Sequence, residues 1–212
     1  MFFTQQLKTI AAALTLGLAA TAASAANFSF SGNFEHDNDV QLFSFTVSVP
    51  TSVSLRSWSY AGGTNAAGTV IASGGFDPIL SLFDATGKLL REQDDAKCEL
   101  VAADSVTGFC WDVFYTTPLA AGTYTASIQQ YDNFSTSYNL ADGFYYDGVA
   151  NQDFRHGFID GDDSVRDAHW AFDILNVDSA VQVVSAVAEP ESLALVGLGL
   201  FAMVALRRRR QN

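Results

Sequence analysis

Basic residues, histidine and cysteine are scarce in this sequence, and each scarcity excludes a class of function. The 212 residues include 11 Lys and Arg against 23 Asp and Glu, with three His and two Cys. Residues 26–188 hold six basic and twenty-one acidic side chains, and this net charge of −15 repels nucleic acid and anionic lipid. Two cysteines are too few for a disulfide-dense scaffold and leave little for a zinc cluster.

Familiar catalytic motifs are also missing. The sequence has no G-x-S-x-G elbow, no H-E-x-x-H pair and no Gly-rich phosphate loop. His36, His156 and His169 lie far apart, and none is placed to activate a cysteine nucleophile. We therefore expect no enzymatic activity and no required cofactor. A glycoside hydrolase needs only two carboxylates, so it stays open as a third alternative.

What the middle of the chain does have is an alternation of apolar and polar side chains. The chain has 49% hydrophobic and 16% charged residues. Because disordered chains have few hydrophobic and many charged residues, this composition excludes one. The run that contains Val40, Leu42, Phe43, Phe45, Val47 and Val49 predicts a half-buried strand that Pro50 ends. Further strands are expected at residues 28–30, 53–55, 78–83, 88–91, 123–128 and 169–177.

The spacing of these strands predicts the fold. Turn residues at 84–87 join two of them into a β-hairpin, and residues 118–122 form a turn that enters the strand at 123. Residues 61–75 form a loop or a weak strand around 70–71. No stretch of twelve residues in this region has a helical period. We therefore expect an all-β ectodomain over residues 27–185, an antiparallel β-sandwich or jelly roll.

Residues 1–26 have the features of a secretory signal peptide. Lys8 precedes an apolar run over residues 10–20, and the small residues Ala23-Ser24-Ala25 follow. The run is too short for a comfortable membrane span, which is the alternative interpretation. We expect signal peptidase to cleave after Ala25 or Ala26.

The segment 186–212 predicts a short C-terminal transmembrane helix. Residues 193–206 carry no charge, and at about 1.5 Å rise per residue they span roughly 21 Å of a hydrocarbon core of about 30 Å. The basic cluster behind them stays on the cytoplasmic side, so the predicted insertion in the inner membrane is marginal and transient. This cluster consists of Arg207, Arg208, Arg209 and Arg210.

This tail resembles a PEP-CTERM sorting signal, which has a Pro-Glu-Pro box, a short apolar helix and an arginine cluster. The box here reads Ala188, Glu189, Pro190, Glu191 and Ser192. Ala188 departs from the family pattern, which has proline there. The resemblance implies processing by an exosortase, in bacteria of the Gram-negative type that make exopolysaccharide, and delivery to the cell surface or extracellular matrix. A plain C-terminal anchor is the alternative.

A second resemblance concerns the ectodomain. Residues 76–84 read F-D-P-I-L-S-L-F-D, Asp94-Asp95 follow, and residues 119–124 read L-A-A-G-T-Y. This order is similar to the pre-peptidase C-terminal (PPC) domains, which are small extracellular β-sandwiches. Residues 39–45 and 170–177 further resemble an exported family with PEP-CTERM tails and no assigned function. The resemblance implies a fold and no activity.

Cys98 and Cys110 are expected to form a disulfide. They are the only cysteines of a chain predicted to leave the reducing cytoplasm. Closing so short a loop contributes about 3 kcal/mol in the chain-entropy model.

Acidic loops make calcium a candidate ligand. Calcium takes six to eight oxygen ligands, and loops from different parts of a sandwich can meet at one end. Solvated turns are the alternative, because no loop has the twelve-residue EF-hand pattern. The candidate ligands are Asp37 and Asp39, Asp94 and Asp95, and Asp160, Asp162 and Asp163.

Tyrosines among Asn, Asp and Ser residues make a glycan another candidate ligand. Aromatic rings bordered by hydrogen-bonding groups suit stacking on sugars. The alternative is that the rings fill the core beneath a long loop. The candidates are Tyr131, Tyr138, Tyr145 and Tyr146.

Together these features predict a non-enzymatic exported protein of the surface or matrix, and a carbohydrate-binding module for the exopolysaccharide is the alternative.

Overall fold

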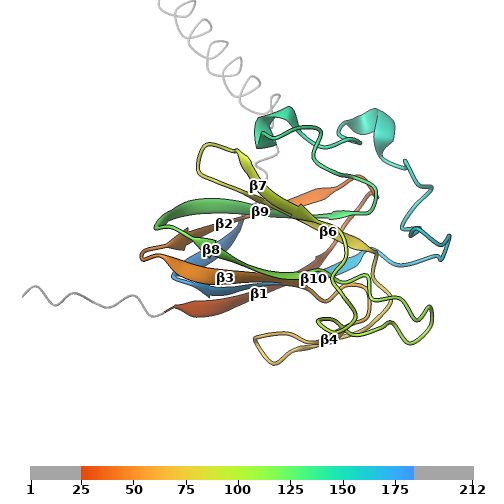
Figure 1. Cartoon of the computed structure of the whole chain (residues 1–212). Coiled ribbons are helices and arrows are strands. Elements are labelled where there is room, and N and C mark those ends of the chain that lie inside the picture. The colour runs from red at the N-terminus through yellow and green to blue at the C-terminus, as the bar shows by residue number, and fades with distance from the viewer. Residues whose placement is uncertain (1–24, 184–212) are drawn as a thin grey trace, which may run out of the picture.

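The chain folds into two antiparallel sheets that pack face to face (Figure 1). The computed structural model describes residues 25–183. The four-stranded sheet has the order β1-β10-β3-β8, and the five-stranded sheet has the order β11-β2-β9-β6-β7. This confirms the predicted β-sandwich. The predicted signal peptide up to residue 24 and the sorting tail from residue 184 onward lie outside the described residues.

The strands are short and account for nearly all of the regular structure. The four-stranded sheet consists of β1 (Ala26–Asn33), β10 (His169–Val177), β3 (Thr51–Ser57) and β8 (Phe114–Leu119). The five-stranded sheet consists of β11 (Ser179–Val183), β2 (Val40–Val47), β9 (Gly122–Gln130), β6 (Pro78–Phe83) and β7 (Leu89–Gln93). A small ribbon pairs β4 (Gly63–Thr64) with β5 (Val70–Ile71), and two 3-10 turns cover Leu140–Asp142 and Val149–Asn151.

Strand β2 shows how the alternation builds the core. Phe43, Phe45 and Val47 are buried between the sheets. Val40 and Leu42 lie on the opposite face of the strand, where they are only partly buried. Val49 lies beyond the end of β2 and is 66% exposed, so the predicted strand is two residues too long.

Two strands of the main sheets are not predicted from the sequence. The predicted turn at 118–122 is wrong in its first residues, because Pro118 lies inside β8 and is paired with Ser52 of β3. Proline is tolerated there because β8 is an edge strand and needs no donor on its open side. Strand β11 is not predicted by the sequence either, since Ala180 is its only buried residue.

The β6–β7 hairpin is confirmed and fixes the geometry of the candidate site. One carboxylate oxygen of Asp84 accepts hydrogen bonds from the amides of Thr86 (2.8 Å) and Lys88 (3.0 Å). Gly87 adopts φ 82°, a value that favours glycine. Because the two strands run antiparallel, the end of β7 returns beside the beginning of β6.

Candidate metal site

The candidate site lies where β6 begins, and Asp77 is its innermost residue. Pro78, the first residue of β6, is paired with Gln130 of β9, and the Asp77 carbonyl accepts the amide of Tyr131 at 2.8 Å. This pairing fixes the backbone of Asp77 against the neighbouring strand. Its side chain is only 3% exposed, and Oδ1 has no hydrogen-bond partner among the described residues. A buried carboxylate oxygen without a hydrogen-bond donor has lost its hydration, and no hydrogen bond from the described residues offsets the free-energy cost of that loss.

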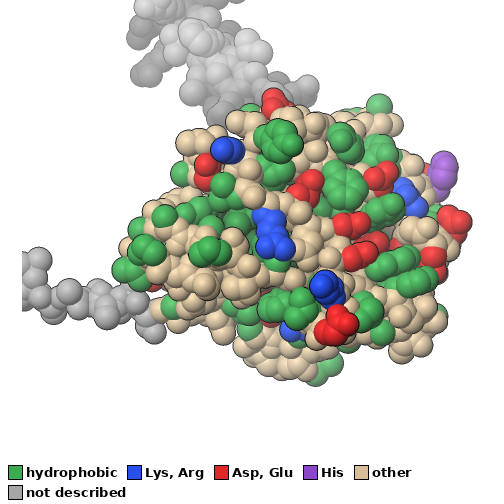
Figure 2. Space-filling view, in the orientation of Figure 1, with side chains coloured by type: hydrophobic (Ala, Val, Ile, Leu, Met, Phe, Trp, Pro, Cys, Tyr) green, Lys and Arg blue, Asp and Glu red, His purple; other side chains and the backbone are tan. Residues whose placement is uncertain are grey.

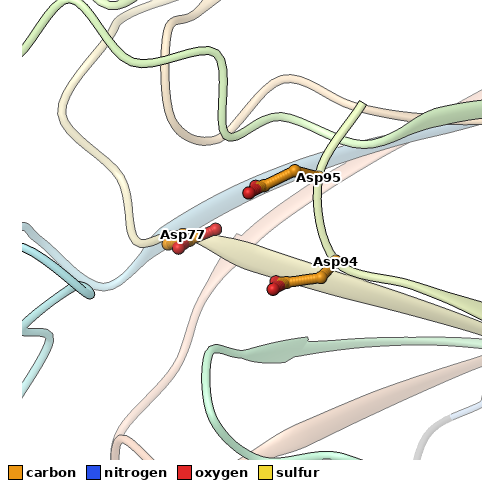
Figure 3. Close-up of side chains that lie close together, drawn as sticks. All are labelled: Asp77, Asp94 and Asp95. Atoms are coloured by element: carbon orange, nitrogen blue, oxygen red, sulfur yellow. The ribbon is translucent and has the colours of Figure 1, made fainter. Parts of the chain in front are cut away.

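Asp94 and Asp95 complete the site because they follow β7 directly. The hairpin register pairs Gln93 with Leu80, which brings the next two residues beside Asp77. One oxygen from each of the three carboxylates lies within 4.8 Å of the others, and Figure 3 shows the three side chains directed toward a common space. Oδ1 of Asp94 is also buried without a hydrogen-bond partner, whereas Asp95 is exposed. The site therefore has a buried base and an open side.

The electrostatics of the site are strongly unfavourable for three separate anions. Burial, and then the charges of Asp94 and Asp95, raise the pKa of Asp77 well above its usual value. Burial and the charge of Asp95 raise the pKa of Asp94 to about 7. Although Asp95 lies at the open side, partial desolvation of its carboxylate and the charge of Asp112 raise its pKa to about 6. Figure 2, in the orientation of Figure 1, shows several acidic side chains gathered on the face where β6 begins.

Three carboxylates at this spacing form a set of hard oxygen ligands. Such ligands suit Ca²⁺ or Mg²⁺, whereas zinc and copper sites use imidazole or thiolate groups. Calcium–oxygen bonds of about 2.3–2.6 Å place opposite ligands roughly 5 Å apart, which agrees with the spacing of these oxygens. The residues present therefore fit a calcium ion.

The acids of the first predicted loop do not join this site. Asp37 is buried and accepts the amides of Phe154 (3.1 Å) and Arg155 (2.9 Å). Asp39 accepts the amide of Glu35 at 2.8 Å. Both carboxylates therefore accept hydrogen bonds from backbone amides and hold the loops that carry those amides in place.

The third predicted loop is organised in a similar way. Asp160 accepts the amide of Ser164 at 2.9 Å and the hydroxyl of Tyr60 at 3.0 Å. Asp162 accepts the same amide at 3.2 Å, and Asp163 is exposed with φ 66°. Of the seven predicted ligands, Asp94 and Asp95 are the two that belong to the cluster with Asp77. Asp77, the third carboxylate of the cluster, is not among the residues predicted from the sequence; the signal that reveals it is its place before β6, opposite the end of β7.

The predicted tyrosines separate into two pairs. Tyr138 (81% exposed) and Tyr145 (58% exposed) line one shallow hollow of about 270 Å³, together with Glu92. Tyr146 instead stacks on Phe154, with ring centroids 3.7 Å apart. Tyr131 is half-buried, with its ring edge-on to a neighbouring phenylalanine. Only Tyr138 and Tyr145 among the four therefore present strongly exposed rings at a common surface hollow.

The predicted disulfide between Cys98 and Cys110 is confirmed, with 5.2 Å between the two Cα atoms. It closes a loop in the connection between β7 and β8, which carries the chain from one sheet to the other. Cys110 also belongs to a small apolar cluster with Ala96 and Val101. The disulfide therefore stiffens the segment that leads away from Asp95.

Comparison with known proteins concerns the tail. Residues 186–210 match the PEP-CTERM protein-sorting motif, and the search of curated proteins gives no match. The match does not extend to the ectodomain, so the PPC resemblance stays a prediction. Within residues 25–183, no helix is long and apolar enough to span a bilayer, and the predicted helix 193–206 lies outside them. The chain carries a PEP-CTERM protein-sorting motif at residues 186–210, and this motif implies an exported protein that an exosortase sorts.

Proposed function

We propose that this chain is a non-enzymatic protein of the cell surface or extracellular matrix, and that it associates with the exopolysaccharide of a biofilm. The observation that carries the proposal is the sorting motif at residues 186–210, attached to a β-sandwich. The signal peptide, the transient inner-membrane anchor and cleavage by signal peptidase and exosortase are parts of the same route.

The arrangement of the carboxylates supports a non-enzymatic role. Glycoside hydrolases hold two carboxyl groups about 5–9.5 Å apart, on either side of the bond that breaks. At the candidate metal site, three oxygens lie within 4.8 Å of one another, and the innermost residue, Asp77, is buried. This geometry suits a cation better than a sugar ring between an acid and a base.

Processing of the tail is the first prediction. In the native host, we expect a product that starts at Ala26 or Asn27 and ends near residues 189–191, recovered in the matrix. Cleavage after Ala25 leaves β1 complete, because this strand begins at Ala26. Intact mass spectrometry of each cell fraction, with and without the exosortase gene, measures this.

The controls separate sorting from plain anchoring. Replacing Arg207–Arg210 with glutamine removes the cytoplasmic stop and is expected to abolish matrix delivery, whereas Gln211→Ala is expected to have no effect. A wild-type product that keeps Arg207–Arg210 and stays in the inner membrane would mean that Ala188 prevents recognition. The chain would then be an ordinary anchored protein.

The alternative function, a carbohydrate-binding module, rests on the hollow lined by Tyr138 and Tyr145. If it binds the host's secreted polysaccharide, Tyr138→Ala and Tyr145→Ala should each weaken binding roughly tenfold, since stacking contributes about 1 kcal/mol or more. Phe109→Ala, an exposed ring outside this hollow, is the matched control. Affinity electrophoresis in gels containing that polysaccharide measures the effect. If both tyrosine variants bound the polysaccharide as tightly as Phe109→Ala, the carbohydrate-binding hypothesis would be contradicted.

A further inference from the structure

We infer that Asp77, Asp94 and Asp95 bind one calcium ion, which fastens the β7–β8 connection to the start of β6. This inference goes beyond the proposed function, because it assigns a ligand and a structural role that export alone does not require. Two observations carry it, the convergence of three carboxylates and the burial of one of them without a partner.

The first observation is convergence from separate segments. Asp77 precedes β6, whereas Asp94 and Asp95 follow β7, and oxygens of all three lie within 4.8 Å of one another (Figure 3). Three anions at this distance repel strongly in a partly buried setting. A single divalent cation converts this repulsion into attraction.

The second observation is independent of the clustering. Asp77 is 3% exposed, and its Oδ1 meets no donor among the described residues. Two other buried acids do accept hydrogen bonds: Asp112 accepts the hydroxyl of Ser57 at 2.7 Å and the amide of Ala61 at 2.9 Å. Asp173, whose Oδ1 also lacks a partner, accepts the indole N–H of Trp58 through Oδ2 at 2.8 Å. A carboxylate that is buried, directed at two others and left without a donor is what a cation ligand requires.

The open side of the site favours calcium over magnesium. Three carboxylates supply between three and six oxygens, depending on whether each binds through one oxygen or two, and water can complete the shell beside the exposed Asp95. Magnesium keeps most of its own waters and demands near-ideal octahedral geometry, so it gains less from three fixed carboxylates. We expect a Kd of about 10⁻⁴–10⁻³ M, the range of extracellular calcium modules.

The structural role follows from the position of the site. Residues 94–113 carry the chain from β7 in one sheet to β8 in the other. The amide of Ala96 donates to the Asp112 carbonyl at 3.1 Å, and the disulfide closes the loop that follows. An ion at Asp94 and Asp95 fixes the first residues of this crossing to Asp77. Binding therefore stabilises the folded sandwich.

The test is thermal unfolding of the full chain, purified in detergent and stripped of metal with EDTA. Adding about 10 mM CaCl₂ is expected to raise Tm by about 4–10 °C, whereas MgCl₂ or NaCl at matched ionic strength has a much smaller effect. Isothermal titration with CaCl₂ is expected to give one site per chain. No rise in Tm, or an equal rise with magnesium, would overturn the inference.

The variants distinguish ligation from general screening. Asp77→Asn is expected to abolish the calcium response while leaving the metal-free protein at least as stable as the wild type, because it removes a buried carboxyl group whose Oδ1 has no hydrogen-bond partner. Asp95→Asn is expected to weaken calcium binding at least tenfold. Asp163→Asn is the matched control, since this exposed acid lies outside the cluster and asparagine tolerates its positive φ. A full response in Asp77→Asn would also overturn the inference. Processing of the tail is measured independently of calcium. The proposed function and the calcium inference can therefore be contradicted separately.

Discussion

Replacing Arg166 with methionine is expected to destabilise the sandwich by about 3–5 kcal/mol. The Arg166 side chain is 5% exposed, and it lies 3.4 Å from the Asp104 carboxylate and 4.0 Å from that of Asp160. It also donates to the carbonyls of Gly75 (3.0 Å) and Tyr60 (2.8 Å). Removing it leaves two buried carboxylates without their cation and the Gly75 carbonyl without its donor, while the Tyr60 carbonyl keeps only the amide of Gly74 at 3.1 Å. The β3–β6, β7–β8 and β9–β10 connections lose their common partner.

Urea unfolding followed by tryptophan fluorescence measures this loss. Arg166→Lys keeps the charge but not the planar fork, so we expect an intermediate loss. Adding Asp104→Asn to Arg166→Met should recover part of the stability, because one buried anion is removed along with the cation. Arg91→Met, at an exposed arginine, should cost less than about 1 kcal/mol. A loss of similar size for Arg166→Met would show that the buried network contributes no net stability.

The sequence predicts the central strands well because their patterns depend on burial alone. Strands β6 and β10 are buried along nearly their whole length, and they stand out as apolar runs at 78–83 and 169–177. The edge strands β8 and β11 are stabilised by one neighbour each, and few of their side chains reach the core. Their existence depends on a partner strand that the local sequence does not contain.

The candidate site is only partly predictable for the same reason. Asp94 and Asp95 stand out in the sequence as an acidic pair. Asp77 joins them only because the register of the hairpin places it beside the end of β7. Conversely, Asp37 looks like a free loop acid, yet its carboxylate accepts the amide of Arg155, 118 residues away. Which acids are satisfied and which are left for a cation is decided by long-range backbone contacts. Composition and spacing carry no information about these contacts.

The second large effect is expected at Phe43, where substitution by alanine should cost about 3–5 kcal/mol. Phe43 belongs to β2 in the five-stranded sheet and is fully buried. Its ring lies 4.8 Å from that of Phe30, 5.6 Å from that of Trp170 and 4.9 Å from that of Phe172, measured between centroids. All three partners belong to the opposite sheet, in β1 and β10. Truncation therefore opens a cavity between the two layers and removes three aromatic contacts.

Two companion variants make this loss interpretable by urea unfolding. Phe43→Leu keeps most of the buried volume, so it should cost roughly 1–1.5 kcal/mol and remain folded even if the alanine variant does not. Val181→Ala changes an exposed residue on β11, the neighbour of β2, and should stay within about 0.5 kcal/mol of the wild type. If Phe43→Ala cost no more than Phe43→Leu, the surrounding rings would have closed over the cavity. Cohesion between the sheets would then depend on aliphatic residues such as Leu55 and Leu80 rather than on this aromatic contact.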